Sequence, residues 1–263
     1  MLEKITPLIL TLDEAPNIAR VLDRLAWAAD VVVVDSFSED ETCEIVRRYP
    51  NTRLFQRRFD LHSNQWNFGL RQTGIATEWV LALDADFVLP DAFVSEIGAL
   101  APDRGVAGYR ASFTYCIEGQ PLRNTVYPPV TVLYRRPNAA YAQDGHTQRV
   151  RLTNGAVLPI ASRILHDDRK SFRRWLRSQD RYMRLESAKL AATPFSGLRL
   201  QDKVRRLVFV APLAMLFYCL FAKGNVLDGR AGFVYAVQRF LAEAILSYHL
   251  ARASVSNKAQ TIR

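Results

Sequence analysis

The sequence predicts an α/β protein in which helices flank a mostly parallel central sheet, with a helical hairpin near the C-terminus. Short apolar runs alternate with amphipathic segments of helical length over the first hundred residues, which is typical of βαβ units. Residues 31–34 are four consecutive valines, a pattern that favours a strand buried on both faces. Apolar residues make up 49% of the 263 residues, enough to form the core of one large domain with an appendage.

The predicted elements follow one another in a regular order. We expect strands at residues 7–10, 31–34, 54–55 and 79–83. Apolar positions with helical spacing predict helices at residues 18–25, around Ile45 and at residues 64–73, and Pro90-Asp91 begins a further helix. Runs at residues 108–115 and 130–134 extend or cover the sheet, and residues 160–165 form another short apolar run.

The net charge of +9 is unevenly distributed along the chain. Residues 1–160 carry 16 Lys/Arg and 19 Asp/Glu, a net charge of −3, whereas residues 161–263 carry 19 and 7, a net charge of +12. This asymmetry predicts a catalytic body followed by a region that faces phosphates of nucleic acid, of a ligand or of an anionic membrane. The three cysteines lie far apart without a CxxC spacing, which argues against a disulfide framework or a zinc ribbon.

Two apolar segments near the C-terminus bear on localisation. The N-terminal segment lacks the pattern of a secretory signal, so we expect the protein to stay in the cytoplasm. Residues 207–222 hold no charge but fall short of the ~20 residues that a spanning helix requires. Residues 231–250 are largely apolar but carry Arg239 and Glu243. We interpret the pair as a hairpin turned at residues 223–230 that enters one leaflet or lies on the membrane surface; a buried pair of core helices is the alternative.

Polar and acidic residues follow three of the predicted strands. They occupy residues 11–14, residues 35–38 and residues 84–86. Because ligands of a parallel α/β sheet bind beyond the carboxyl ends of its strands, these residues are candidates for the chemistry. No GxGxxG motif follows the first strand and no GxxxxGK[ST] motif occurs, which disfavours a dinucleotide-dependent dehydrogenase and a P-loop NTPase.

Asp84 and Asp86 form a candidate metal site. They are two residues apart at a strand end, so their carboxylates leave the same face of the pleat. Two such oxygen donors suit Mg²⁺ or Mn²⁺ held largely by water and by a substrate's phosphates. The alternative is a pair of solvated carboxylates before the helix that begins at Pro90-Asp91. Asp35 favours the metal site, because packing does not explain a carboxylate directly after a four-valine strand.

Two segments of the sequence resemble a known family. LILTLDEAPNIARVLDRLAWAADVVVVDSFSEDET and QWNFGLRQTGIATEWVLALDADF are similar to the nucleotide-binding half of the family 2 glycosyltransferases, inverting enzymes with the Rossmann-like GT-A fold. The similarity covers about residues 5–100 closely and extends less specifically to about residue 185. It implies a GT-A catalytic domain at residues 1–185, with a nucleotide-sugar half to about residue 100 and an acceptor half to 185. Residues 186–263 then form a helical, membrane-associated region.

The resemblance assigns donor-binding roles. It implies that Glu14, with its neighbours Thr11 and Asp13, lies in the loop that holds the ribose and base of the nucleotide. Asp13 stands where the family usually has Asn. Asp35 corresponds to the carboxylate that reads the edge of the base.

Further donor contacts follow from the second segment. Gln65 and Asn67 correspond to a segment that packs near the nucleotide in relatives. Asp84 is expected to face the sugar and ribose, and Asp86 to bind the divalent cation. A cation at this place neutralises the leaving diphosphate as the C1–O bond breaks.

The acceptor side requires a general base, because an inverting transfer removes the proton of the attacking hydroxyl. Asp144 is the first candidate, since a carboxylate at the corresponding stretch has this role in similar enzymes. Cell-envelope relatives often have His-Glu where this chain has His146-Thr147, so His146 is the second candidate. A plain turn built on Asp144-Gly145 is the alternative for both.

His166 and the basic segment that follows it complete the candidates. His166 follows an apolar run, where a late histidine often completes the metal shell of GT-A enzymes; a structural histidine is equally open. Residues 169–184 contain seven Lys/Arg and resemble loosely the segment ending in Arg-Trp that steadies the diphosphate. Arg174 and Trp175 are the matching pair. The alternative is a basic amphipathic helix on anionic lipid, worth ~1 kcal/mol per basic residue.

Together these features predict a membrane-associated, metal-dependent inverting glycosyltransferase at the cytoplasmic face of the inner membrane. The expected donor is a UDP-linked sugar, and the expected acceptor is a lipid-linked glycan or lipopolysaccharide core. The chain resembles most the bacterial enzymes that build such cell-envelope glycans. The alternatives are transfer to polyprenyl phosphate, or a basic protein that binds nucleic acid or membranes without catalysis. No nucleic-acid partner is expected, because the C-terminal aromatics lie in an amphipathic pattern without a recognisable RNA or DNA motif.

Overall fold

The computed structural model describes residues 1–144 and 147–261, with side chains for all of these except residue 147 and residues 254–261. The chain forms two compact units. The first comprises Met1–Pro121 and Tyr127–Lys170, and the second Leu122–Val126 and Ser171–Arg263. The boundary that the sequence suggested at residue 185 lies inside a helix of the second unit, so the assignment of functions to residue ranges remains a prediction.

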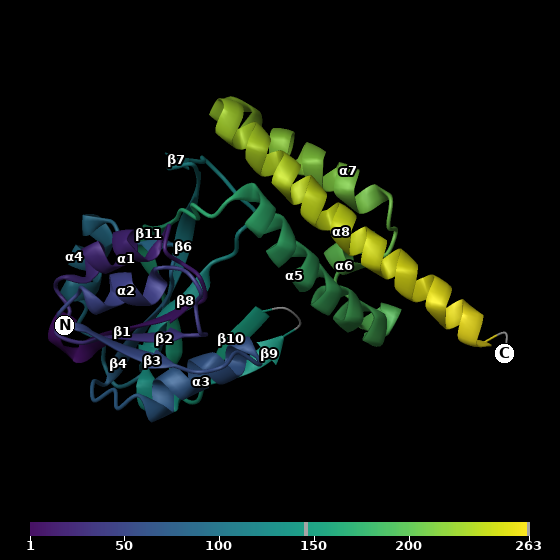
Figure 1. The fold of residues 1–263 in the computed structure, drawn as a ribbon. Helices are drawn as coiled ribbons and strands as arrows, with labels where there is room; N and C mark the ends of the chain where they lie inside the picture. Colours follow the sequence, from purple (N-terminus) through teal and green to yellow (C-terminus); the bar gives the residue numbers. More distant parts are fainter. Residues whose placement is uncertain (145–146, 262–263) are drawn as a thin grey trace. The chain divides into compact units, whose positions relative to one another are not determined.

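The first unit is built on a mixed sheet (Figure 1), and the α/β prediction is confirmed. Its strands are β1 (Ile5–Thr11), β2 (Val31–Asp35), β3 (Thr52–Gln56), β4 (Trp79–Asp84), β5 (Phe87–Val88), β6 (Val106–Ile117), β7 (Gln120–Pro121), β8 (Val130–Arg135) and β11 (Ala156–His166). They run in the order β3-β2-β1-β4-β8-β6-β11-β5, with β7 paired to β6. The first four are parallel, whereas β8 is antiparallel to both of its neighbours. The prediction of a mostly parallel sheet therefore fits the four N-terminal strands β1–β4 best.

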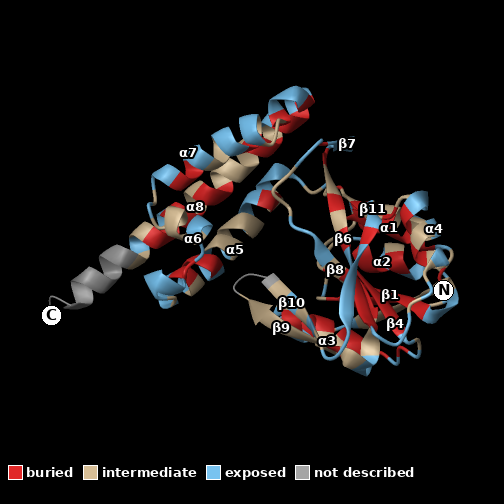
Figure 2. Ribbon diagram, turned by 180° about the vertical axis from the view of Figure 1, so that it is seen from behind, coloured by how far each residue is buried: buried red, intermediate tan, exposed pale blue. Residues whose placement is uncertain are grey.

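Helices cover both faces of this sheet. The α-helices are α1 (Ile18–Leu22), α2 (Thr42–Arg47), α3 (His62–Gln72) and α4 (Asp91–Ala99), with short helical turns η1 (Leu2–Lys4), η2 (Asp23–Leu25) and η3 (Arg136–Asn138). Successive side chains of a strand point to opposite faces. Val31 and Val33 accordingly pack in the core cluster that contains residues of α1, α2 and α4, while Val32 and Val34 pack in the cluster that contains residues of α3. All four valines are fully buried, which explains the uninterrupted apolar run. Figure 2 shows that the strands beside β1 are mostly buried.

The strand register brings the polar strand ends to one edge of the sheet. Thr11 lies opposite Asp35, and Leu10 lies opposite Asp84. Parallel pairing of β1 with β2 and β4 therefore aligns the three acidic loops that follow these strands. The convergence expected from the sequence is present in the fold.

A separate antiparallel hairpin, β9 (Ala139–Asp144) and β10 (Thr147–Leu152), lies beside α3. The Asn67 amide of α3 holds this hairpin: it donates to the Tyr141 carbonyl and accepts from the Tyr141 N–H, both at 2.9 Å. Asp144 thus ends a strand, where the sequence also allowed a plain loop.

The second unit is helical. It contains α5 (Phe172–Ala192), η4 (Phe195–Gly197), α6 (Leu200–Arg205), α7 (Val210–Phe217), the π-helical turn η5 (Tyr218–Ala222), η6 (Asn225–Asp228) and α8 (Gly229–Thr261). Both α5 and α7 pack against α8. Arg205 of α6 and Glu243 of α8 form an ion pair of 2.7 Å, in which the Glu243 side chain is buried. The expected helical hairpin is present, with its turn between Ala222 and Gly229.

In the part of the chain that the structure describes, no single helix has both the length and the apolar character needed to cross a membrane. The segments Val210–Ala222 and Asn225–Ala253 meet these criteria only when taken together, and they are bent by 70° at their junction.

Candidate active site

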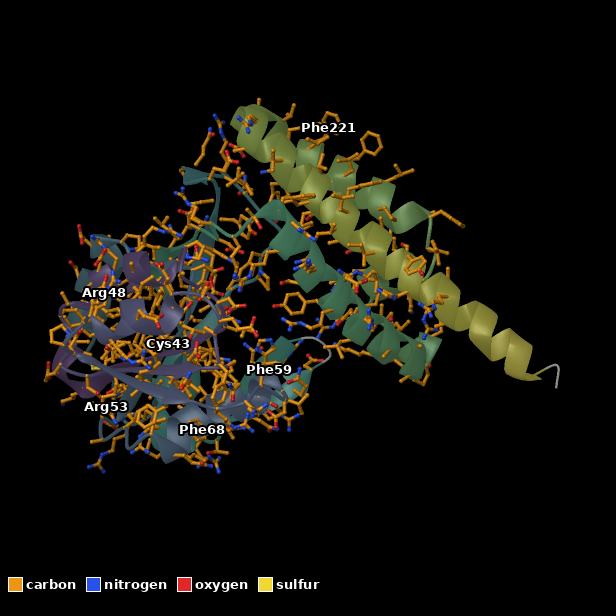
Figure 3. All side chains as sticks on the ribbon, in the orientation of Figure 1. Cys43, Arg48, Arg53, Phe59, Phe68 and Phe221 are labelled. Carbon is orange, nitrogen blue, oxygen red and sulfur yellow. The ribbon has the colours of Figure 1, made fainter. Side chains whose placement is uncertain are left out.

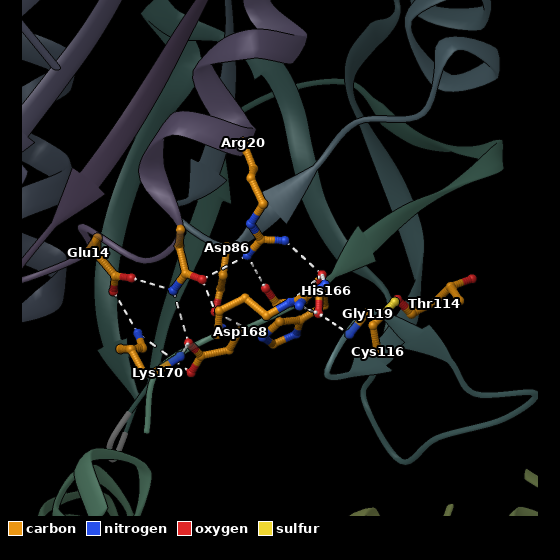
Figure 4. Close-up of polar contacts among 12 residues, drawn as sticks. Glu14, Arg20, Asp86, Thr114, Cys116, Gly119, His166, Asp168 and Lys170 are labelled. Atoms are coloured by element: carbon orange, nitrogen blue, oxygen red, sulfur yellow. Dashed lines mark hydrogen bonds and ion pairs between the residues drawn. The ribbon is translucent and has the colours of Figure 1, made fainter. Parts of the chain in front are cut away.

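The ends of β1, β4 and β11 bring a cluster of titratable groups together in the first unit (Figure 4). Glu14 follows β1, Asp84 and Asp86 end β4 and its turn, and His166 ends β11. The segment directly after β11 adds Lys170. Contacts of 3.3 Å between His166 and Asp86 and of 2.7 Å between Lys170 and Glu14 connect these groups.

Asp86 and His166 form the buried centre of the cluster. His166 Nε2 lies 3.3 Å from Asp86 Oδ2, and the two side chains are 13% and 11% exposed. The imidazole is packed among Tyr115, Tyr127 and Phe87, with ring centroids 4.6, 4.8 and 5.1 Å away. This aromatic surround fixes the orientation of the ring.

Two buried atoms of this pair have no hydrogen-bond partner among the described residues: Asp86 Oδ1 and His166 Nδ1. Buried polar atoms are nearly always satisfied, so such atoms indicate a missing ligand. The facing atoms Asp86 Oδ2 and His166 Nε2, 3.3 Å apart, are an oxygen and a nitrogen donor that fit Mg²⁺ or Mn²⁺ when phosphate oxygens and water complete the shell. No group of three or more His, Cys, Asp or Glu side chains suited to a metal occurs within residues 1–144 and 147–261.

The electrostatics of the site favour the ionised form of Asp86 and disfavour the ionised form of Asp84. Burial alone would disfavour the charged form of Asp86, but His166 and Lys170 hold the pKa of Asp86 below its usual value. Burial and the neighbouring Asp86 charge raise the pKa of Asp84 to about 6. The Asp84 carboxylate has no hydrogen bond or ion pair with any described residue. A cation or a hydroxyl-bearing ligand would stabilise its charged form.

Asp35 lies at the end of β2 and is fully buried. Thr11 Oγ1 donates to its Oδ2 at 2.9 Å, and the Ser38 N–H donates to its Oδ1 at 2.8 Å. Burial opposes its charge, but these hydrogen bonds hold the pKa of Asp35 below its usual value. Thr11 and Asp35 thus organise the loop after β2, and their contact with a nucleotide remains a prediction.

Asp35→Asn should destabilise the fold by about 1–3 kcal/mol at pH 7, because an amide nitrogen or a neutral oxygen replaces a charged acceptor of buried donors. The folded-state pKa of Asp35 is lowered, so its stabilising effect is present above the unfolded value near 3.8 and disappears as the pH falls through the lower folded-state value. Urea unfolding of the wild type and of Asp35→Asn, at pH 7 and at about pH 3, measures the difference in their free energies of unfolding. If this difference between wild type and variant is the same at both pH values, the buried Asp35 carboxylate does not stabilise the fold through its charge.

The loop after β1 has a left-handed residue. Asp13 has φ of 52°, a conformation that Asp and Asn adopt more readily than other side chains. Its N–H donates to Ser38 Oγ, and its Oδ1 accepts from the Glu39 N–H, each at 2.7 Å. The backbone thus explains why Asp can stand where the resemblance expects Asn, and Asp13 serves the loop itself.

Glu14 points into the cluster, where its side chain is 13% exposed. Its two oxygens accept from Lys170 Nζ at 2.7 Å and from Asn17 Nδ2 at 2.9 Å. Burial and the charge of Asp86 raise the pKa of Glu14 to about 7, although Lys170 opposes this shift. Glu14 is therefore a buried carboxylate held next to the Asp86 centre.

Gln65 and Asn67 of α3 have their amides occupied by the protein. Gln65 accepts from Arg57 at 2.6 Å and donates to Ser36 Oγ at 2.8 Å, so it holds the loop after β2. Asn67 binds the backbone of the β9–β10 hairpin, as described above. Their predicted proximity to the nucleotide remains untested.

Asp144 is the last residue of β9 in the hairpin. The residues of the cluster come from other elements, the ends of β1, β4 and β11. Arg149 Nε of β10 lies 2.5 Å from Asp144 Oδ2, and the carboxyl side chain is 26% exposed. His146 lies outside the described residues. The choice between the two as general base therefore stays open.

Arg174 and Trp175 belong to the second unit, in the first turns of α5. Ser171 caps this helix, since its Oγ accepts from the Arg174 N–H at 3.4 Å. Trp175 is buried and stacks on Phe172 at 5.5 Å. Trp175 has a structural role in its own unit, and a diphosphate contact of the pair remains a prediction.

Several polar residues of the cluster carried no distinctive signal in the sequence. Asn17 is fully buried and bridges Glu14 and Asp168 through its amide nitrogen, both at 2.9 Å. Arg20 donates to Asp167 Oδ2 at 2.7 Å. The clue available was positional: HDDRK at residues 166–170 directly follows an apolar run, as the other acidic loops do.

The chain is similar to a known family and to solved structures. The sequence model of the family described as "Glycosyl transferase family 2" matches residues 8–150, which include Glu14, Asp35 and Asp86. Among solved structures, the chain is similar to S. aureus TarS 1-349 in complex with UDP-GlcNAc, with 14% identity over 97% of this chain and 92% of that chain and a TM-score of 0.49. It is also similar to glucosyl-3-phosphoglycerate synthase from Mycobacterium tuberculosis in complex with Mn²⁺, uridine diphosphate and glucosyl-3-phosphoglycerate, with 18% identity over 75% and 83% of the two chains and a TM-score of 0.48.

Proposed function

The chain belongs to glycosyl transferase family 2 and is a glycosyltransferase, and from this premise we propose that it moves a sugar, with inversion, from a UDP-linked donor to a lipid-linked or lipopolysaccharide-core glycan. The observation that carries the donor part is the buried pair of Asp86 and His166, whose facing atoms Oδ2 and Nε2 lie 3.3 Å apart and in which Asp86 Oδ1 has no partner among the described residues. The carboxylates of Glu14, Asp84 and Asp86 together attract a cation, and a bound cation would attract a diphosphate.

Each residue of the cluster has a distinct part in this proposal. Asp86 and His166 would hold Mg²⁺ or Mn²⁺, which neutralises charge on the leaving diphosphate when bound. Asp84 and Glu14 are half-buried acceptors suited to hydroxyls of the donor. Asp144 takes the proton of the acceptor hydroxyl, with His146 as the alternative base.

A thermal-shift screen of nucleoside diphosphate sugars, each with Mn²⁺, with Mg²⁺ and with a chelator, tests the donor. A ligand that binds only the folded state and is present at 100 times its Kd adds about 2.7 kcal/mol to the free energy of unfolding, which gives a readily measured rise in melting temperature. We expect a UDP-sugar to raise the melting temperature only when a cation is present. If no nucleotide sugar raises it with either cation, the proposed function is wrong.

An apolar surface on the second unit supports the membrane part of the proposal. Large side chains of α7, η5 and η6 are exposed, with Phe217 57%, Phe221 65% and Leu227 67% accessible, and Phe209 directly before α7 is 85% accessible. The Phe221 ring projects away from the helices in Figure 3. Soluble monomers rarely expose contiguous apolar surface of this kind, whereas membrane-surface helices do so.

Basic residues of the second unit lie over some of its exposed aromatic rings. Lys223 lies 5.6 Å from the centroid of the Tyr218 ring, and Lys203 lies 5.4 Å from that of Phe195. Such residues interact with anionic headgroups at about 1 kcal/mol each. We propose that α7 and η5 lie against lipid at the cytoplasmic face of the inner membrane.

The double variant Phe217→Ser/Phe221→Ser should lose most of its sedimentation with anionic liposomes, because each buried aromatic ring contributes about 1.5–3 kcal/mol. Both side chains are exposed, so the fold should be retained. Phe59→Ser, an exposed phenylalanine of the first unit, is the matched control and should sediment like the wild type. Unchanged sedimentation of the double variant would remove α7 and η5 from the membrane contact.

The acceptor is tested with extracted membrane lipid and radiolabelled donor. Transfer of label into a glycolipid fraction with an inverted anomeric configuration is the expected result. Label in a polyprenyl phosphate fraction alone would replace the proposed acceptor class and leave the donor assignment unchanged.

A further inference from the structure

The segment after β11 supplies an ammonium group to an otherwise acidic site (Figure 4). Lys170 Nζ lies 2.7 Å from Glu14 Oε1 and 3.6 Å from Asp168 Oδ2. The lysine side chain is 17% exposed, so its charge is largely withdrawn from water. Burial opposes the charged form, yet the charges of Glu14, Asp86 and Asp168 raise the pKa of Lys170 above its usual value. Lys170 is therefore charged at neutral pH and acts electrostatically on Asp86.

The neighbouring arginines are committed to another carboxylate. Arg20 donates from NH1 to Asp167 Oδ2 and from NH2 to the Asp167 carbonyl, both at 2.7 Å. Arg169 Nε donates to the two Asp167 carboxylate oxygens at 3.0 and 2.9 Å. Both guanidinium groups are therefore held by Asp167, although Arg20 Nε is a buried donor without a partner among the described residues. A lysine ammonium, in contrast, is a compact charge with three rotatable donors. Lys170 is the cation placed to change partners.

The carboxylates that receive Lys170 do not depend on it for their position. Asn17 Nδ2 donates to Glu14 Oε2 and to Asp168 Oδ1, both at 2.9 Å. The Lys170 backbone is also held, because its N–H donates to Asp168 Oδ1 at 3.0 Å. The four-carbon side chain can therefore move while Glu14, Asp168 and its own backbone stay in place.

We propose that Lys170 is the resident counter-ion of the donor site: its ammonium neutralises Glu14 and Asp168 in the free protein, and it transfers to the diphosphate when the metal–nucleotide complex binds. A divalent cation beside Asp86 repels the ammonium, because both are positive. The diphosphate then offers new acceptors for the lysine donors. The inference rests on the proposed function and adds a ligand residue beyond the residues matched by the family model.

Lys170→Met should change the binding of two ligands in opposite directions. Mn²⁺ alone should bind about threefold or more tightly, since a competing positive charge is gone. UDP at saturating Mn²⁺ should bind about 10–100-fold more weakly, since a charged hydrogen bond to the diphosphate is lost. Uridine should bind equally to both proteins. Titration calorimetry with MnCl₂, UDP and uridine, together with Mn²⁺ electron paramagnetic resonance, measures these changes.

Lys189→Met is the matched control, because Lys189 also faces a glutamate, Glu186 at 4.0 Å, but on α5. It should leave all three affinities unchanged. Lys170→Gln still donates a hydrogen bond to Glu14 without charge, and it should show the same opposed shifts if the methionine variant unfolds.

Weaker binding of both Mn²⁺ and UDP by a folded Lys170 variant would assign the lysine a structural role and overturn the inference. Unchanged UDP affinity would overturn it as well. Wild-type protein that fails to bind UDP with Mn²⁺ would instead refute the proposed function, and the inference with it.

Discussion

Asp86→Asn should abolish cation-dependent donor binding and reduce turnover by more than ~100-fold, since even loss of an outer-shell partner of a metal ligand typically costs 10–100-fold. Asp86 is 8% exposed, and its Oδ1 has no partner among the described residues. An amide at this position cannot supply the charge that a hard cation requires. The overall fold should persist, because the substitution changes no volume and leaves the core clusters intact.

The measurements are UDP titration with and without Mn²⁺ and turnover with the donor that the thermal-shift screen identifies. Asp91→Asn provides the matched control, because it makes the same change at an exposed carboxylate. It should behave like the wild type. If Asp86→Asn binds UDP as tightly as the wild type in the presence of Mn²⁺, the cation is not held by Asp86.

Asp144→Asn should leave UDP binding unchanged and slow transfer by about 10²–10⁴-fold, the usual effect of losing a general base. Asp144 ends β9 on a hairpin that Asn67 fixes to α3, so the carboxyl group has a defined support. Single-turnover transfer with bound donor separates this effect from donor affinity.

Arg149→Gln separates catalysis from the stability of the hairpin. It removes the ion pair with Asp144 but keeps the carboxylate, so it should retain most of the transfer activity. Equal losses in the two variants would mean that the pair only stabilises the hairpin. Full activity of Asp144→Asn together with inactive His146→Gln would move the role of base to His146.

The sheet and its acidic edge could be predicted because their signals are local. Alternate side chains of β2 face two different helix layers, so both faces of the strand are buried and all of residues 31–34 are apolar. Parallel pairing then places Asp35 beside Thr11 and Asp84 beside Leu10. Each of these conclusions needs only the pattern of one segment and the rule that parallel strands end at the same edge.

The contacts that complete the site could not be predicted from such patterns. Lys170 reaches Glu14 across 156 positions of sequence, and this pairing depends on β11 returning next to β6. Asn67 is a second example: the resemblance implies that it lies near the nucleotide, and only the structure shows that its amide binds the Tyr141 backbone. Side-chain amides and ammonium groups have many possible partners, so their use is decided by the tertiary structure.

The central claim is that the acidic ends of β1 and β4, together with His166, hold a cation-bridged nucleoside diphosphate. Anomalous scattering from Mn²⁺ in crystals grown with UDP locates the cation directly. We predict that it lies against Asp86 and His166 and contacts the diphosphate. A UDP complex in which Mn²⁺ lies elsewhere, or in which UDP binds without any cation, would contradict the account.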